Sequence, residues 1–355
     1  MVGSFVYGGL PTRVVFGSGT LARLPDEVAR LEARRVLVLT TPHQAVEGER
    51  VVRLLGDLAA GVYCGAVMHT PAEVTRDAME TLQGAGADCV VSLGGGSTIG
   101  LGKALALRTG VNQIAVPTTY AGSEMTPILG ETKDGLKTTV RTLDVLPETV
   151  IYDVDLTLSL PVGLTGTSGI NAIAHAVEAL YAQDRNPIVS LMAEEGIRAL
   201  AAALPRIVER PSDAEARAEA LYGAWLCGSC LGTVGMALHH KLCHTLGGSF
   251  DLPHAETHTV VLPHAAAYNS AAAPEALARV ATALGVADAP QGLFDLAGSV
   301  GAKRALKDLG MAEAGIEQAA DLAVKNPYWN PRPVDRAAIR DLIARAWAGD
   351  RPVAA

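Results

Sequence analysis

Features that mark membrane, nucleic-acid-binding and disulfide-rich proteins are missing from this sequence. It has no run of about 18 apolar residues, so no membrane span is expected. Its N-terminus has no charged segment followed by an apolar run, so no signal peptide is expected. Lysine and arginine are scattered and the net charge is −8, which disfavours a nucleic-acid partner. We therefore expect a cytoplasmic protein.

Cysteine is also scarce, and its placement fits a reducing compartment. The five cysteines are an odd number, and no framework of paired half-cystines is visible. Cys227 and Cys230 form a C-x-x-C motif inside an Ala/Leu-rich segment with helical spacing. A redox pair would require a thioredoxin-like strand–helix context. The segment instead predicts buried structural thiols.

The chain is long and apolar enough for two globular domains. It has 355 residues, of which 49% are hydrophobic and 19% charged. In the first part, short apolar runs at 36–40, 88–93, 113–117 and 148–152 alternate with helical patterns at 71–84 and 99–107. This alternation predicts a Rossmann-like α/β domain over residues 1–160 with a largely parallel sheet. From residue 161 to 355 the helical period dominates, for example at 188–204, 214–232, 274–284 and 334–348, which predicts an all-helical domain.

A glycine-rich loop joins one predicted strand to a helix. Gly94, Gly95, Gly96, Ser97 and Thr98 follow the strand at 88–93. Glycines let the backbone approach a pyrophosphate, and a helix N-terminus offers free N–H groups to it. The next strand is followed by Thr118, Thr119 and Ser123, which would lie at the same edge of the sheet. A tight turn without a ligand is the alternative, because Gly-Gly-Gly-Ser matches neither the P-loop nor G-x-G-x-x-G.

Histidines are concentrated in the second half. His240 and His244 are four residues apart, so a helix would project them from one face. Gly247-Gly248 is predicted to end that helix, and His254 follows after Pro253. Upstream, Asn171 and His175 are again four apart. Two facing helices would bring these side chains into one pocket for a metal or for proton transfer. The alternative is a set of core histidines without a ligand.

These motifs, in this order, resemble those of the iron-containing (group III) alcohol dehydrogenase superfamily, whose fold is dehydroquinate synthase-like. The resemblance runs from Gly-Gly-Gly-Ser through Pro117-Thr118-Thr119, Asn171…His175 and His240…His244 to Pro253-His254. It implies a nucleotide-binding domain, a helical domain, a nicotinamide cofactor and a metal bound between them. By position, the metal ligands would be Asn171, His175, His240 and His254.

Two departures from that pattern point to a particular branch. Asn171 stands where the superfamily has an aspartate ligand, and Gly100 stands where it usually has another aspartate. A neutral amide is a poorer ligand for a divalent cation. These features resemble the maleylacetate reductase branch, which implies NAD(P)H-dependent reduction of the C=C bond of maleylacetate to 3-oxoadipate. We expect that no metal is required; if one is present, His175, His240 and His254 would hold it.

The resemblance also assigns expected roles. Catalysis and substrate binding would involve His175, His240, His244, His254, Asn171 and Lys241, with Arg332 a further candidate for a substrate carboxylate. Cofactor binding would involve Gly94, Gly95, Gly96, Ser97, Thr98, Thr118, Thr119, Ser123, Lys137 and Thr40. Because Thr40 and Thr41 are neutral, both NADH and NADPH are expected to be accepted. The expected partner is a small dicarboxylate, and the expected assembly is a homodimer. The alternatives are a metal-dependent alcohol or polyol dehydrogenase and a non-catalytic nucleotide-binding module.

Overall fold

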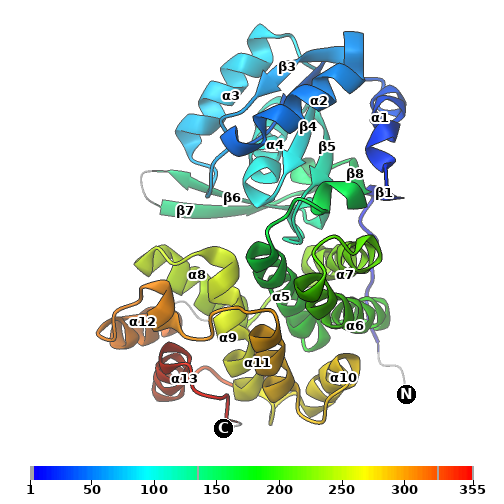
Figure 1. The fold of residues 1–355 in the computed structure, drawn as a ribbon. Helices are drawn as coiled ribbons and strands as arrows, with labels where there is room; N and C mark the ends of the chain where they lie inside the picture. The colour runs from blue at the N-terminus through cyan, green and yellow to red at the C-terminus, as the bar shows by residue number, and fades with distance from the viewer. Residues whose placement is uncertain (1–3, 134–135, 326–327, 354–355) are drawn as a thin grey trace. The chain divides into compact units, whose positions relative to one another are not determined.

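The computed structural model describes residues 4–133, 136–325 and 328–353, which form two compact units (Figure 1). One unit comprises Leu10–Leu160. The other begins at Pro161 and includes the N-terminal segment as far as Gly9. The first is built on a parallel sheet and the second on helices, so the fold class predicted from the sequence is confirmed.

The sheet unit contains six strands, all parallel, in the order β1-β8-β5-β4-β2-β3. Its strands β2, β4 and β5 are β-branched and apolar runs that are almost entirely buried, because helices cover both faces of the sheet. The strand bounds are β1 Arg13–Gly17, β2 Val36–Leu39, β3 Ala59–Tyr63, β4 Cys89–Gly94, β5 Asn112–Pro117 and β8 Thr149–Asp153.

Four helices connect these strands: α1 Leu24–Arg30, α2 Ala45–Leu55, α3 Ala72–Gly84 and α4 Gly96–Thr109. Helix α4 ends at Gly110, whose φ of 72° is the left-handed conformation typical of a glycine cap. An antiparallel hairpin of β6 Ile128–Lys133 and β7 Leu136–Arg141 follows β5. The sequence analysis does not predict this hairpin, because its strands lack the apolar alternation of a buried sheet.

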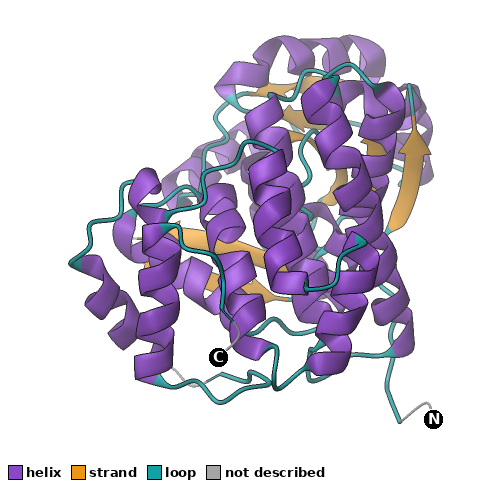
Figure 2. Ribbon diagram, turned by 60° about the horizontal axis from the view of Figure 1, so that its bottom comes forward, coloured by secondary structure: helices purple, strands orange, loops and turns teal. Residues whose placement is uncertain are grey.

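In the described residues of the second unit every regular element is a helix (Figure 2). The bounds are α5 Val162–Leu180, α6 Pro187–Glu209, α7 Ala214–Thr233, α8 Leu238–Phe250, α9 His254–Asn269, α10 Pro274–Leu284, α11 Ala289–Ser299, α12 Gly315–Val324 and α13 Arg336–Ala348. Helix α5 is buried on all sides from Thr165 to Leu180, as a central helix must be. No single helix of the described residues passes a length-and-hydropathy test for a membrane span; α7 and α8 pass it only together, across a bend of 94°.

One helix end differs from the sequence prediction. Helix α8 does not stop at Gly247-Gly248 but continues to Phe250, and Asp251 takes the left-handed conformation with a φ of 52°. The ring of Phe250 packs on the apolar core of α8, α9, α12 and α13 and lies against Gly315. Burying this ring outweighs the cost of helical glycine, which is about 1 kcal/mol per residue. Cys227 and Cys230 are free, buried thiols on α7, as predicted.

Candidate active site

The candidate region of the sheet unit is the carboxyl edge of the parallel sheet, here called the nucleotide edge. Strand β4 lies between β5 and β2, so the segments that follow these three strands are neighbours. Gly94 pairs with Pro117 at the ends of β4 and β5. Gln44, in the connection after β2, donates from Nε2 to Thr118 Oγ1 at 3.1 Å. Open parallel sheets bind ligands at such an edge, where the strand order reverses.

The glycine loop at this edge has the shape of an anion-binding turn. Gly94 has a φ of 151°, which favours glycine, and α4 begins two residues later at Gly96. A Cβ on Gly95 would lie 3.0 Å from Thr119 Cγ2, whereas a Cβ on Gly96 would meet nothing within 4 Å. The exposed backbone at Gly96 and the first N–H groups of α4 are therefore available to a phosphate. These residues fit the pyrophosphate of a dinucleotide.

The structure separates the other predicted cofactor residues. Thr118 and Thr119 lie beside the glycine loop, and Ser123 begins a short 3-10 helix after them. Thr40 is fully buried, and its methyl carbon lies 2.9 Å from the position that a Cβ on Gly48 of α2 would take. Lys137 is on β7 opposite Thr132, and its side chain is outside the described part of the structure.

A strained turn lies next to the start of α4. His69 and Thr70 have φ values of 66° and 45°, which non-glycine residues adopt at an energetic cost. Thr70 is buried, and a Cβ on Gly100 would lie 2.5 Å from its Oγ1. A side chain at Gly100, the second departure from the superfamily pattern, would therefore force the Thr70 hydroxyl to move.

The candidate region of the helical unit is a group of six imidazoles, here called the histidine cluster. Helix α5 supplies His175, α8 supplies His239, His240 and His244, and α9 supplies His254 and His258. Ring centroids of neighbouring members lie 4.3 to 6.5 Å apart. The structure thus brings together all four histidines predicted from the sequence and adds two more.

A carboxylate orders the buried side of the cluster. His240 Nδ1 is 2.7 Å from Glu178 Oε2, and His240 Nε2 is 2.7 Å from His175 Nδ1. An ionised Glu178 only accepts hydrogen bonds, so His240 carries its proton on Nδ1 and accepts from His175 through Nε2. His175 then has its proton on Nδ1 and a lone pair on Nε2. The chain from Glu178 to His175 therefore fixes the tautomers of both imidazoles.

Glu178 also caps α8, whose own N-cap residue, Ala237, has no side chain that can do so. Its two oxygens accept from the backbone N–H groups of Ala237 and His239, each at 2.8 Å, and Tyr181 donates to it at 3.3 Å. Glu178 is fully buried on α5. A negative charge at a helix N-terminus is stabilised by the free N–H groups and the helix dipole.

The histidine cluster has a solvent-exposed side and a buried side, the latter here also called the dry side. His244 and His254 are exposed, with rings nearly parallel at 28° and centroids 6.4 Å apart. His239 and His258 are fully buried, and His239 Nε2 lies 3.0 Å from His258 Nδ1. Burial, reinforced by the neighbouring imidazoles, lowers the pKa of both buried rings well below the ordinary value. These two are neutral at pH 7, and the exposed pair is the part of the cluster that an external ligand can reach.

The four residues that correspond to the superfamily's metal ligands fit a divalent cation poorly. Nitrogen ligands of a tetrahedral metal are about 3.3 Å apart, because each is about 2.05 Å from the ion. His175 Nδ1 and His240 Nε2 are closer, at 2.7 Å, and are joined by a hydrogen bond. Asn171 is buried and offers an uncharged oxygen, Oδ1, which has no hydrogen-bond partner. That oxygen can instead accept a hydrogen bond from a ligand or a water molecule.

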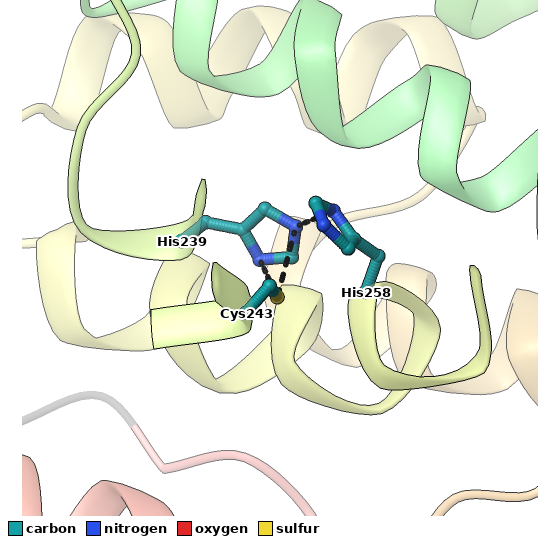
Figure 3. Close-up of side chains that lie close together, drawn as sticks. All are labelled: His239, Cys243 and His258. Carbon is teal, nitrogen blue, oxygen red and sulfur yellow. Dashed lines mark hydrogen bonds between the residues drawn. The ribbon is translucent and has the colours of Figure 1, made fainter. Parts of the chain in front are cut away.

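A second set of possible metal ligands lies on the dry side of the cluster. His239, Cys243 and His258 have potential ligand atoms within 4.8 Å of one another (Figure 3). Cys243 Sγ lies 3.8 Å from His239 Nε2. A metal would require the thiolate, whereas burial and the Glu178 carboxylate raise the pKa of Cys243 well above its ordinary value. This set is a candidate site whose cysteine is protonated in the metal-free protein.

The two predicted substrate cations lie outside the cluster. Lys241 is on α8, half-buried, with Nζ 5.5 Å from the centre of the Tyr328 ring. Arg332 stacks on Tyr268, 4.1 Å from its ring centre, and donates to the Tyr268 carbonyl. Tyr268 is ten residues after His258 on α9, which corresponds to roughly 15 Å along a helix. Both stay predictions for substrate binding, with Arg332 placed beside the more distant part of α9.

The comparisons with known proteins agree with this architecture. Residues 11–154 match the iron-containing alcohol dehydrogenase model, and residues 165–347 match the C-terminal model of the Fe-containing alcohol dehydrogenase family. The chain belongs to the iron-containing alcohol dehydrogenase family.

Within the family, the similarity is high to proteins of one activity. The maleylacetate reductase of Rhizobium sp. (strain MTP-10005) is 58% identical over 98% of this chain and 99% of its own. The crystal structure of maleylacetate reductase from Agrobacterium tumefaciens has a TM-score of 0.96 at 58% identity, covering 99% of this chain and 100% of that one. An iron-containing alcohol dehydrogenase from Corynebacterium glutamicum has a TM-score of 0.93 at 43% identity, covering 97% of each chain.

Proposed function

We propose that this protein is an oxidoreductase that uses NADH or NADPH to reduce the C=C bond of maleylacetate, giving 3-oxoadipate. The observation that carries the proposal is the similarity to maleylacetate reductases, at 52–58% identity over 98–99% of the chain. The neutral Asn171 supports it, because a metal-dependent alcohol dehydrogenase needs an anionic ligand there. A homodimer remains an expectation from the family.

The histidine cluster suits the polar steps of this reaction. A bound NADH or NADPH would supply the hydride, which the alkene carbon beta to the ketone would accept, so that negative charge would develop on the ketone oxygen. A hydrogen-bond donor aimed at that oxygen stabilises the enolate. The carbon next to the ketone takes up a proton, which completes the two-electron reduction. His244 and His254 are exposed imidazoles that can supply the donor and the proton, while Glu178, His240 and His175 hold the inner side of the cluster rigid.

No step of this proposal uses a metal, and removing metal provides its main test. NADH oxidation with maleylacetate should proceed at the same rate before and after dialysis against EDTA, with metal content followed by elemental analysis. Loss of activity on chelation, restored by iron or zinc, would contradict the metal-independent mechanism. Oxidation of simple alcohols without turnover of maleylacetate would contradict the proposed reaction itself.

Asn171→Asp provides a control for the metal assay, because it should increase metal retention relative to the wild type. A carboxylate at this position restores the charged oxygen ligand that the amide lacks. Retention of iron or zinc by Asn171→Asp, with little in the wild type, would show that elemental analysis detects an occupied site. Equal metal content in both proteins would mean that Asn171 does not determine occupancy.

Cofactor affinity should depend on the space in front of Gly95. We expect Gly95→Val to raise the Michaelis constant for NADH roughly 5- to 150-fold, since displacing Thr119 costs about 1–3 kcal/mol. Steady-state kinetics at saturating maleylacetate measure this effect. Gly84→Val, in which the added Cβ meets nothing within 4 Å, is the matched control. An unchanged constant for Gly95→Val would remove Gly95 from the cofactor site.

Discrimination between NADH and NADPH should respond to Thr41, the half-buried residue after β2, rather than to the buried Thr40. Thr41→Asp places a negative charge beside the short 3-10 helix that carries Gln44. Repulsion of a 2′-phosphate at about 4 Å is at least about 1 kcal/mol, so NADPH should lose roughly fivefold more kcat/KM than NADH. Equal losses for both cofactors would show that Thr41 does not face the ribose.

A further inference from the structure

A buried lysine, Lys103, contacts the backbone of the segment that follows the nucleotide edge. Lys103 lies on α4, seven residues after Gly96, and is fully buried. Its Nζ donates to the carbonyl oxygens of Ser123, Thr126 and Ile128 at 2.6, 2.7 and 2.9 Å, and lies 2.9 Å from Thr126 Oγ1. A buried lysine is uncommon, and four oxygens around its amine show that the site is shaped for it.

The acceptors all belong to one stretch of backbone. Ser123 to Ile128 runs from the short 3-10 helix after β5 to the start of β6. The same stretch follows Thr118 and Thr119, which lie beside the glycine loop. Lys103 therefore connects the helix that begins at the glycine loop to the loop that carries the neighbouring hydroxyl groups.

A second buried contact holds the other side of this stretch. Glu124 is 1% exposed and accepts a hydrogen bond from Tyr152 of β8 at 2.8 Å. The 123–128 segment is thus attached to α4 through Lys103 and to the sheet through Glu124. Burial lowers the pKa of Lys103 to about 7, so the geometry of the contacts, more than a full charge, carries this attachment. Losing one partner of such a buried network leaves the others unsatisfied.

We infer that Lys103 is a positioning residue for the nicotinamide nucleotide: it holds the 118–128 segment against α4 in the conformation that receives the cofactor. The inference rests on the proposed function only in taking NADH or NADPH as the ligand. Its consequence is a loss of cofactor affinity, without a change in chemistry at saturating cofactor, when the Lys103 contacts are weakened.

The test uses a mild change within the Lys103 network, with a matched control. Thr126→Val removes the Oγ1 contact with Lys103 and the Oγ1 hydrogen bond to the Ser123 carbonyl and keeps the shape of the residue, whereas Thr126→Ser keeps the hydroxyl. Isothermal titration of the full-length protein with NADH should give a dissociation constant roughly three- to tenfold higher for Thr126→Val, and close to wild type for Thr126→Ser. The rate constant kcat at saturating NADH should remain within about twofold of wild type.

Two further variants separate positioning from general stability. Lys103→Met should weaken NADH binding more than Thr126→Val does, and Lys303→Met, which removes an exposed lysine of the helical unit, should leave binding unchanged. Equal dissociation constants for wild type, Thr126→Val and Lys103→Met would overturn the inference, as would an equal effect of Thr126→Ser. Because binding is measured without maleylacetate, a failure of the proposed substrate would leave this result interpretable.

Discussion

Glu178→Ala should lower the free energy of unfolding of the helical unit by about 3–5 kcal/mol, the usual cost of removing one member of a buried charged network. The substitution removes the acceptor for the backbone N–H groups of Ala237, His239 and His240 and for His240 Nδ1. Each donor would be left buried without a partner. Urea unfolding followed by circular dichroism measures the change.

Glu178→Gln tests the tautomer argument at nearly constant volume. Both Glu178 oxygens accept N–H donors, so the amide nitrogen of glutamine must oppose one of them. If that nitrogen faces His240 Nδ1, the His240 proton moves to Nε2. We expect kcat to fall by about 10- to 100-fold, the range typical of residues that orient a functional histidine. Glu195→Gln, on the exposed face of α6, is the control. Wild-type kinetics and stability in Glu178→Gln would contradict this role.

His244→Ala and His254→Ala should each reduce kcat by about 100- to 10,000-fold, the contribution expected of a positioned proton donor. These are the two members of the histidine cluster that an external ligand can reach. Because both are exposed, their loss should leave the unfolding free energy within about 0.5 kcal/mol of wild type. Single-turnover oxidation of NADH with maleylacetate isolates the chemical step.

The matched variants His244→Gln and His254→Gln distinguish two roles of an imidazole. Glutamine donates a hydrogen bond but cannot transfer a proton near neutral pH. A residue that only stabilises the enolate should recover part of its rate as glutamine, whereas the proton donor should not. Wild-type rates in both alanine variants would place the chemistry elsewhere in the molecule.

The buried strands and the side-chain pairs that share a helix face can be predicted from the sequence. Buried strands are short apolar runs, and the pairs Asn171/His175 and His240/His244 share a helix face because four residues complete about one turn. His258 follows the same rule, four residues after His254 on α9, and that spacing was a usable signal. Glu178 also had a local signal, since it lies one turn after His175 on α5.

Sequence spacing does not predict contacts between segments that are distant along the chain. Glu178 meets Ala237 across 59 residues, and Lys103 meets Ile128 from a different element. The end of α8 was predicted wrongly because local glycine propensity was outweighed by the packing of Phe250 near Gly315, a contact that only the folded chain reveals. Thr40 was assigned to the cofactor by its place after a strand, but it faces Gly48 beneath α2.

The contact between Thr70 and Gly100 constrains how this chain can change during evolution. A Cβ at position 100 would lie 2.5 Å from Thr70 Oγ1, so an aspartate there would force the Thr70 hydroxyl to move. The effect of a side chain at position 100 therefore depends on the residue at position 70, and a smaller residue at position 70 should ease its entry. A single substitution of Gly100 by aspartate should strain the turn at Thr70, whereas the same substitution beside a smaller residue at position 70 should be better tolerated.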